Sequence, residues 1–117
     1  MEIEIRIMQS GDEALIAALE QKCFSAPWSE KMILDAKRLT RAIFYVAEVD
    51  GDFAGYAGMM SVLDEGNVFN IAADPKYRRC GVGTALTRAL IKYSERMGLS
   101  VLVLEARESN VAARALY

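Results

Sequence analysis

The chain has 117 residues, of which 53% are hydrophobic and 26% charged, so we expect one folded domain over residues 1–117. A formal net charge of −2 and the lack of any histidine exclude a broad basic surface for nucleic acid, zinc sites and histidine-based catalytic pairs, so no metal is expected. No apolar run reaches the roughly 20 residues of a membrane span, so we expect a cytoplasmic protein without membrane contact.

The first half of the chain predicts a strand followed by two helices. Residues 1–8 alternate with a period of two, which indicates a strand. Ser10 and Glu13 have the spacing of a capping box, so a helix is expected to begin there and to run to about Cys23. The segment "SAPWSE" interrupts it, and Ser29 is the expected N-cap of a short helix that ends near Arg38.

Three short strands are predicted next. Residues 42–49 and 53–63 are strand-like and flank Asp50-Gly51, a pair that favours a tight hairpin. Residues 64–67, "DEGN", suggest a second turn before a strand over 68–73. Strands joined by such short turns must be antiparallel.

A long helix, a fifth strand and a last helix complete the predicted elements. The long helix ends near Gly98, the fifth strand covers 100–106, and Asn110 caps a helix that reaches Tyr117. Because the long helix joins the fourth and fifth strands, these two strands should be parallel. We therefore predict an α/β fold with a mixed, mostly antiparallel sheet. The expected apolar stripe of the long helix consists of Val82, Ala85, Leu86, Ala89, Leu90, Tyr93 and Met97.

The start of the long helix is a candidate anion site. A helix N-terminus presents unpaired N–H groups, and Gly81 and Gly83 leave them open to a ligand. Arg78 and Arg79 add guanidinium groups that suit phosphate oxygens. The spacing fits neither a Walker loop nor a dinucleotide-binding fingerprint. The alternative is that the glycines only turn the chain and the arginines are solvated.

The motif "RRCGVG", preceded by "VFNIAADPKY" and followed by "LEARESNVAARALY", resembles the GNAT superfamily of acetyl-CoA-dependent N-acetyltransferases. Within it, the run from "VLDEGN" onwards is similar to ribosomal-protein-alanine N-acetyltransferases. The resemblance implies a GNAT-like sheet flanked by helices, with splayed fourth and fifth strands. It also implies transfer of an acetyl group to the N-terminal amine of a small-subunit ribosomal protein.

The resemblance implies a set of cofactor contacts as well. The pyrophosphate of acetyl-CoA would lie on the start of the long helix, and the pantetheine arm would pair with the end of the fourth strand. Asn110 matches a further cofactor contact, compatible with its role as an N-cap. The implied phosphate-binding residues are Arg78, Arg79, Cys80, Gly81, Val82, Gly83 and Thr84, and the implied pantetheine-binding residues are Ile71, Ala72 and Ala73.

Two side chains match the family's catalytic groups. Glu105 would act as the general base and Tyr117 as the general acid that protonates the leaving thiolate. By strand periodicity alone, Glu105 would be a charge at the rim of the sheet. A backbone N–H near Ala73 is expected to polarise the thioester carbonyl.

Family members continue beyond the tyrosine with two further strands, whereas this chain stops at Tyr117. The fifth strand would then have an open edge that favours self-association. Either the chain is a shortened form or another copy supplies the missing strands. Two alternative functions stay open at this point: acetylation of a small-molecule amine or a lysine, and CoA binding without turnover.

Overall fold

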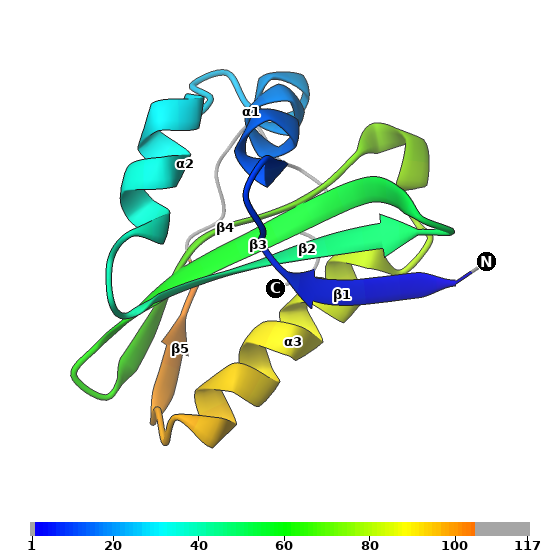
Figure 1. Ribbon diagram of the computed structural model, residues 1–117. Coiled ribbons are helices and arrows are strands. Elements are labelled where there is room, and N and C mark those ends of the chain that lie inside the picture. Colours follow the sequence, from blue (N-terminus) through cyan, green and yellow to red (C-terminus); the bar gives the residue numbers. More distant parts are fainter. Residues whose placement is uncertain (1, 105–117) are drawn as a thin grey trace.

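Two helices cover one face of a five-stranded sheet and a third covers the other, as the computed structural model shows for residues 2–104 (Figure 1). None of the helices described there is long and apolar enough to cross a bilayer. The elements in chain order are β1 (Ile3–Ile7), α1 (Asp12–Cys23), α2 (Glu30–Lys37), β2 (Ala42–Val49), β3 (Asp52–Val62), β4 (Glu65–Ala73), the 3₁₀ helix η1 (Pro75–Tyr77), α3 (Val82–Arg96) and β5 (Val101–Val103).

The sheet has the order β1-β2-β3-β4-β5, and every neighbouring pair is antiparallel except β4 and β5, which are parallel. The predicted mixed sheet is therefore confirmed, including the crossover through α3. The described part of the fifth strand covers Val101–Val103, and Glu105 and Ala106 of its predicted span lie outside the described residues.

The first predicted turn is confirmed and the second is misplaced. Asp50 and Gly51 have φ values of 50° and 89°, which suit a two-residue hairpin. The second turn consists of Leu63 and Asp64, because Val62 pairs with Glu65 and the strand begins there rather than at residue 68. The residues 65–67 pair with β3 on one side and β5 on the other, and this pairing overrides their turn propensity.

The predicted capping box at Ser10 is wrong, whereas the Ser29 cap is confirmed. The N-cap of α1 is Gly11, with a φ of 100°, and the helix begins at Asp12. Asp12 instead accepts the Gln9 N–H at 2.7 Å and forms an ion pair with Arg6 at 2.7 Å. These two bonds hold Asp12 in the first turn, and the N-cap lies one residue later than predicted, at Gly11 instead of Ser10. Ser29 accepts the Met32 N–H at 3.2 Å, as expected.

The core has two parts, one on each face of the sheet. Side chains from α1, α2 and the strands pack on one face, and the buried residues of α3 pack on the other. The predicted stripe of α3 is correct for Leu86 and Leu90, which are fully buried, but wrong for Met97. Met97 is the C-cap, beyond the last turn that faces the sheet, and Ser94 is buried there instead.

A β-bulge interrupts β4 in its middle. Asn70 pairs with Gly58 of β3 and Val68 pairs with Met59, so Phe69 is an extra residue in β4. Bulges bend a strand and increase its twist. In the described part of the chain, β4 pairs with β5 over Glu65–Asn67, on the amino-terminal side of the bulge. The bulge therefore bends β4 between these residues and the carboxyl end of the strand.

The ion pair at the start of α1 should make stability depend on pH. The hydrogen bond from Arg6 lowers the pKa of Asp12 below its ordinary value of 3.8. A carboxylate with a lowered folded pKa stabilises the protein above its unfolded pKa and loses that effect as the pH falls through the folded value. Asp12→Asn should therefore lower the free energy of unfolding by about 2 kcal/mol at pH 7, and by progressively less below pH 4. Urea denaturation at several pH values measures this.

The matched control is Asp35→Asn. Asp35 pairs with Lys31 at 3.1 Å, but both side chains are more than half exposed. Such pairs contribute little, so this variant should stay within about 0.5 kcal/mol of the wild type at every pH. Equal effects of the two substitutions, or a pH-independent effect at Asp12, would contradict the assignment.

Candidate functional site

The carboxyl end of β4 leads through η1 directly into the N-terminus of α3 (Figure 1). Asp74 fixes this connection, because its side chain accepts the Lys76 N–H at 3.0 Å and pairs with Lys22 of α1 at 3.1 Å. Partial burial acts to raise the pKa of Asp74, but the Lys76 N–H and the Lys22 ammonium outweigh it and lower that pKa. The end of β4 is thus held against the last turn of α1.

The loop before α3 turns sharply into the helix. Arg79 and Gly81 have positive φ values of 64° and 91°, while the residue between them does not. Within the loop, the N–H groups of Arg78 and Cys80 donate to the carbonyls of Pro75 and Tyr77 at 3.4 and 3.3 Å. The first bond within the helix runs from the Ala85 N–H to the Gly81 carbonyl at 2.9 Å. The N–H groups of Val82, Gly83 and Thr84 therefore point out of the helix end, and Gly81 provides no side-chain cap.

Both arginines of the motif are exposed, and within the part of the chain that the structure describes neither forms an ion pair with a carboxylate. The two arginines differ in position. Arg78 lies close to Cys23 of α1, where its guanidinium acts to lower the pKa of the thiol. Cys80 is half-buried, and its thiol donates to the Arg78 carbonyl at 3.7 Å. The geometry thus leaves Arg79 and the helix N–H groups available to an anion.

The edge of β4 next to this loop presents backbone groups that do not pair with β3. The Asp74 N–H donates to the Ala54 carbonyl at 2.7 Å, and Ala73 lies opposite Gly55 in the register. In an antiparallel ladder this arrangement directs the N–H and C=O of Ala73, and of Ile71 two residues earlier, away from β3. Ala72 instead turns its backbone groups towards Tyr56 of β3. Ile71 and Ala73 are thus the predicted pantetheine-binding residues that lie on the outer edge.

A thiol is placed at the same edge. The Cys23 thiol donates to the Ala73 carbonyl at 3.6 Å from the end of α1. Burial raises the pKa of this thiol above its ordinary value, and the nearby Arg78 guanidinium offsets only part of the effect. Cys23 therefore stays protonated at neutral pH and serves as a packing and hydrogen-bonding residue.

A buried polar cluster behind the edge was not predicted from the sequence. Glu20 of α1 is fully buried and accepts bonds from Tyr56 and Asn70 at 2.6 and 2.7 Å. The signal in the sequence was that Glu20 falls on the apolar face of α1, four residues after Ile16. Asn70 could not be found by alternation, because the bulge at Phe69 shifts it to the face of α1.

Three predicted site residues, Glu105, Asn110 and Tyr117, lie outside the described residues. Their roles remain predictions. Across residues 2–104, no group of three or more cysteine and carboxylate side chains could hold a metal ion.

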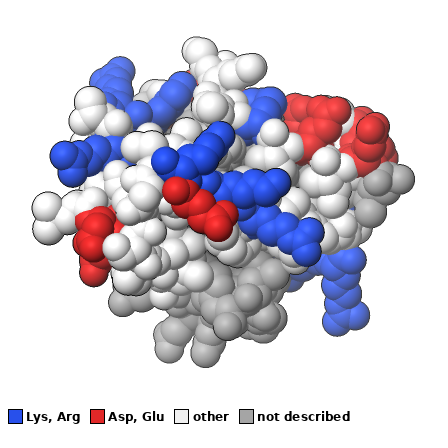
Figure 2. All heavy atoms as spheres, turned by 90° about the horizontal axis from the view of Figure 1, so that it is seen from below, with Lys and Arg blue, Asp and Glu red and all other residues white. Residues whose placement is uncertain are grey.

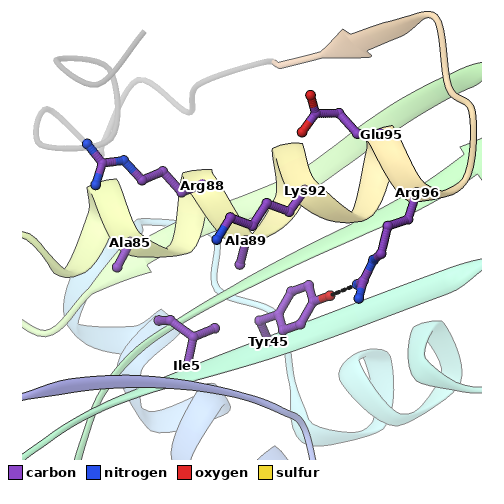
Figure 3. A pocket seen from close by; sticks show the side chains of 8 residues that line it. All are labelled: Ile5, Tyr45, Ala85, Arg88, Ala89, Lys92, Glu95 and Arg96. Atoms are coloured by element: carbon purple, nitrogen blue, oxygen red, sulfur yellow. Dashed lines mark hydrogen bonds between the residues drawn. The ribbon is translucent and has the colours of Figure 1, made fainter.

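A groove of about 600 Å³ lies apart from the site, between α3 and the strands β1 and β2 (Figure 3). Ile5, Tyr45 and Ala89 form part of its lining, and Arg96 donates to the Tyr45 hydroxyl at 3.3 Å. None of the predicted site residues lines it. The candidate site is therefore defined by backbone groups and not by this groove.

Basic side chains gather on the face that carries α3, although the whole chain is slightly acidic (Figure 2). Arg88, Lys92 and Arg96 are exposed along the helix, one turn apart. A local surplus of positive charge attracts anions in spite of the net charge. This surface lies on the same helix as the open N–H groups of Val82–Thr84.

The fold and the site together define an α/β domain that can hold an anion at the start of α3 and an extended chain along β4. A family model described as the acetyltransferase (GNAT) family matches residues 14–117, and the chain belongs to this family. The resemblance inferred from "RRCGVG" is thereby confirmed.

Several relatives are named as ribosomal-protein-alanine N-acetyltransferases. The chain is 42% identical over 99 residues to the ribosomal protein bS18-alanine N-acetyltransferase of Escherichia coli K12, a match that covers 85% of the chain and 66% of that protein. It is 38% identical over 113 residues to the Salmonella typhimurium protein of the same name, covering 97% and 76%. The crystal structure of the ribosomal-protein-S18-alanine N-acetyltransferase from Escherichia coli matches with a TM-score of 0.86 and 38% identity, covering 99% and 74%. The chain thus spans slightly less than two thirds of the first of these relatives.

The left-handed conformation at the start of α3 should be costly for any residue with a Cβ. Gly81→Ala should lower the free energy of unfolding by about 1 kcal/mol through backbone strain. A steric clash is not the cause, because an added Cβ would meet only Ile3 Cδ1 at 3.7 Å. Asn tolerates this conformation, so Gly81→Asn should cost less. Urea denaturation compares the two variants, and equal losses would argue against strain as the cause.

Proposed function

We propose that this chain transfers the acetyl group of acetyl-CoA to the N-terminal α-amine of a protein in the cytoplasm. The proposed acceptor is the N-terminal alanine of a small-subunit ribosomal protein. The observation that carries the proposal is the junction of β4 and α3, where the N–H groups of Val82, Gly83 and Thr84 at the helix start lie beside the edge of β4 that does not pair with β3. Membership of the acetyltransferase family and the names of the relatives support it.

The residues at the junction fit two parts of the co-substrate, the charged pyrophosphate and the extended pantetheine arm. The N–H groups of Val82, Gly83 and Thr84 and the guanidinium of Arg79 would hold the pyrophosphate. The outer edge of β4 would hold the pantetheine arm as an added strand, with Ala73 as a donor. The bulge at Phe69 supports this assignment, because it bends β4 just before the proposed pantetheine-binding residues.

An N-terminal amine is a chemically favourable acceptor for such a site. With a pKa near 8, a sizeable fraction of α-amines is neutral at pH 7, whereas nearly all lysine side chains are protonated. In the transfer, a nitrogen–carbon bond forms, the carbon–sulfur bond breaks, one proton leaves the amine, and the CoA thiolate takes up a proton. Glu105 and Tyr117 are proposed for these two proton transfers on the basis of the family resemblance.

Binding of acetyl-CoA should depend on the start of α3. The double variant Arg79→Glu, Gly83→Asp places two carboxylates where the pyrophosphate would lie. We expect it to weaken the affinity about 100-fold or more, because each charge-assisted contact contributes about 1.5–3 kcal/mol. Calorimetric titration of this chain with acetyl-CoA measures the effect.

The control variant is Lys92→Glu, Met97→Asp, which makes the same change in charge at two exposed positions towards the other end of α3. It should bind acetyl-CoA within about threefold of the wild type, since exposed charges at that distance are screened. A folded wild-type chain that does not bind acetyl-CoA would overturn the proposal for this chain.

The acceptor is tested with a panel of amines. A basic peptide that begins with alanine should be acetylated at its α-amine, as mass spectrometry of the products would reveal. The same peptide with a blocked N-terminus should remain unmodified, although its lysines are free. Acetylation of the blocked peptide or of a polyamine would favour the alternative acceptors, and binding without product would indicate a CoA-binding module.

A further inference from the structure

The strand β1 forms one edge of the sheet, and among residues 2–104 no strand pairs with its outer side (Figure 1). The Met8 N–H donates to the Phe44 carbonyl at 2.9 Å, so every second residue counted back from Met8 bonds to β2. The N–H groups of Ile3, Ile5 and Ile7 therefore point outwards, together with the carbonyls of the same residues. Such an edge is a template for an added strand.

On the side of α3, this edge borders the groove with its apolar floor. Ile5 and Tyr45 form the floor, and Ala85 and Ala89 of α3 face them (Figure 3). Ile7 lies on the same face as Ile5, and its side chain is 59% exposed. The Ile7 carbonyl accepts one bond, from the side chain of the preceding residue at 3.4 Å. The apolar row along β1 is thus partly uncovered.

The wall of the groove is positively charged. Arg88 and Lys92 are exposed on it, and neither forms an ion pair with a carboxylate in the part of the chain that the structure describes. Arg96 donates to the Tyr45 hydroxyl at 3.3 Å, and Glu95 is the one acidic side chain among the described lining residues. A strand added to β1 would direct every second side chain towards this wall. Acidic side chains fit there.

The other face of the edge carries the opposite charge. Arg6 pairs with Asp12 of α1 at 2.7 Å, so the even-numbered side chains of β1 lie on the face that α1 covers. Glu4 is exposed on this face, directly opposite Glu48 of β2. Arg6 reaches Glu48 at 3.3 Å, whereas Glu4 forms no ion pair within residues 2–104. Like charges opposite each other are unfavourable, so a cation beside Glu4 would stabilise this edge.

We propose that the outer edge of β1 is a docking site for an extended segment of another protein in which acidic and basic side chains alternate. The segment adds to the sheet as a further strand. Its acidic side chains lie beside Arg88 and Lys92 on one face, and its basic side chains lie beside Glu4 on the other. The inference does not depend on acetyl-CoA, because β2 and β3 separate this edge from β4.

A second copy of this chain fits the edge less well. On the face of α3, the side chains of β1 are Ile3, Ile5 and Ile7, so a paired copy would bring no carboxylate from this strand to Arg88 and Lys92. Twofold pairing of two β1 strands would also place both α3 helices on the same face of the joined sheet. Their basic side chains would then repel each other across the axis.

The first test is amide hydrogen exchange with a synthetic peptide in which glutamate and lysine alternate strictly, with both ends blocked. At saturating peptide, exchange at Ile5 and Ile7 should become at least about fivefold slower, because their N–H groups gain acceptors. The Glu4 N–H already faces β2 and should change little. A control peptide of the same composition, with all glutamates before the lysines, should bind at least about tenfold more weakly.

Charge reversal on one face, followed by reversal on the other, tests the alternation. Arg88→Glu, Lys92→Glu makes both faces of the edge acidic, so the affinity for the alternating peptide should fall at least about tenfold. Addition of Glu4→Lys restores opposite charges on the two faces. The same peptide, shifted by one residue, should then regain most of the affinity. All three positions are exposed, and urea denaturation verifies that each variant is folded.

The variant Arg79→Glu, Gly83→Asp separates this docking site from the proposed anion site at the start of α3. It should bind the alternating peptide within about threefold of the wild type, because the changed charges are remote and screened. Loss of peptide binding in this variant, with binding retained in Arg88→Glu, Lys92→Glu, would place the peptide at the start of α3 and overturn the inference.

Two further outcomes would contradict the proposal. Equal affinity of the wild type for the alternating peptide and its control would show that the edge does not read alternation. Protection of the Ile5 and Ile7 amides that increases with protein concentration in the absence of peptide would assign the edge to a second copy instead. A failure to bind acetyl-CoA would remove the proposed function but would leave these measurements unaffected.

Discussion

The crossover from β4 through α3 to β5 is the constraint on which the site depends. Two parallel neighbours require the chain to leave the carboxyl end of β4 and to return, so α3 has to begin beside that end. A helix start carries unpaired N–H groups, and the outer edge of β4 carries backbone groups that do not pair with β3. The crossover brings the two together. The capacity to hold an anion and an extended chain thus follows from the topology.

Polar contacts between α1 and β4 hold this junction in place from the opposite face. Glu20, Lys22 and Cys23 lie within one turn of α1, and they bond to Asn70, Asp74 and Ala73. Apolar packing resists separation of a helix and a sheet but allows them to slide. Hydrogen bonds are directional, so three of them in one helical turn fix the position of α1 along the strand. The helix therefore aligns the end of β4 as well as covering it.

The sequence was sufficient for the order and type of the elements, because each has a clear periodicity or turn signal. It was also sufficient for the start of α3, where two glycines and two arginines meet. It failed where a tertiary contact overrides a local pattern. The Arg6 ion pair displaces the Ser10 cap, and the pairing of Glu65 on both sides of β4 displaces the second turn. The bulge at Phe69 has no local signal, because no glycine marks it, and so the role of Asn70 was hidden.

The burial of Cys23 has a consequence for the selectivity of the proposed reaction. A thiol at the edge that would hold an acetyl thioester is a potential competitor for the acetyl group, because thiolates exchange readily with thioesters. Its raised pKa keeps Cys23 in the protonated, weakly nucleophilic form, and its proton is engaged with the Ala73 carbonyl. In the proposed reaction, burial of Cys23 would thus protect the domain from acetylating itself and leave the acetyl group for an incoming amine.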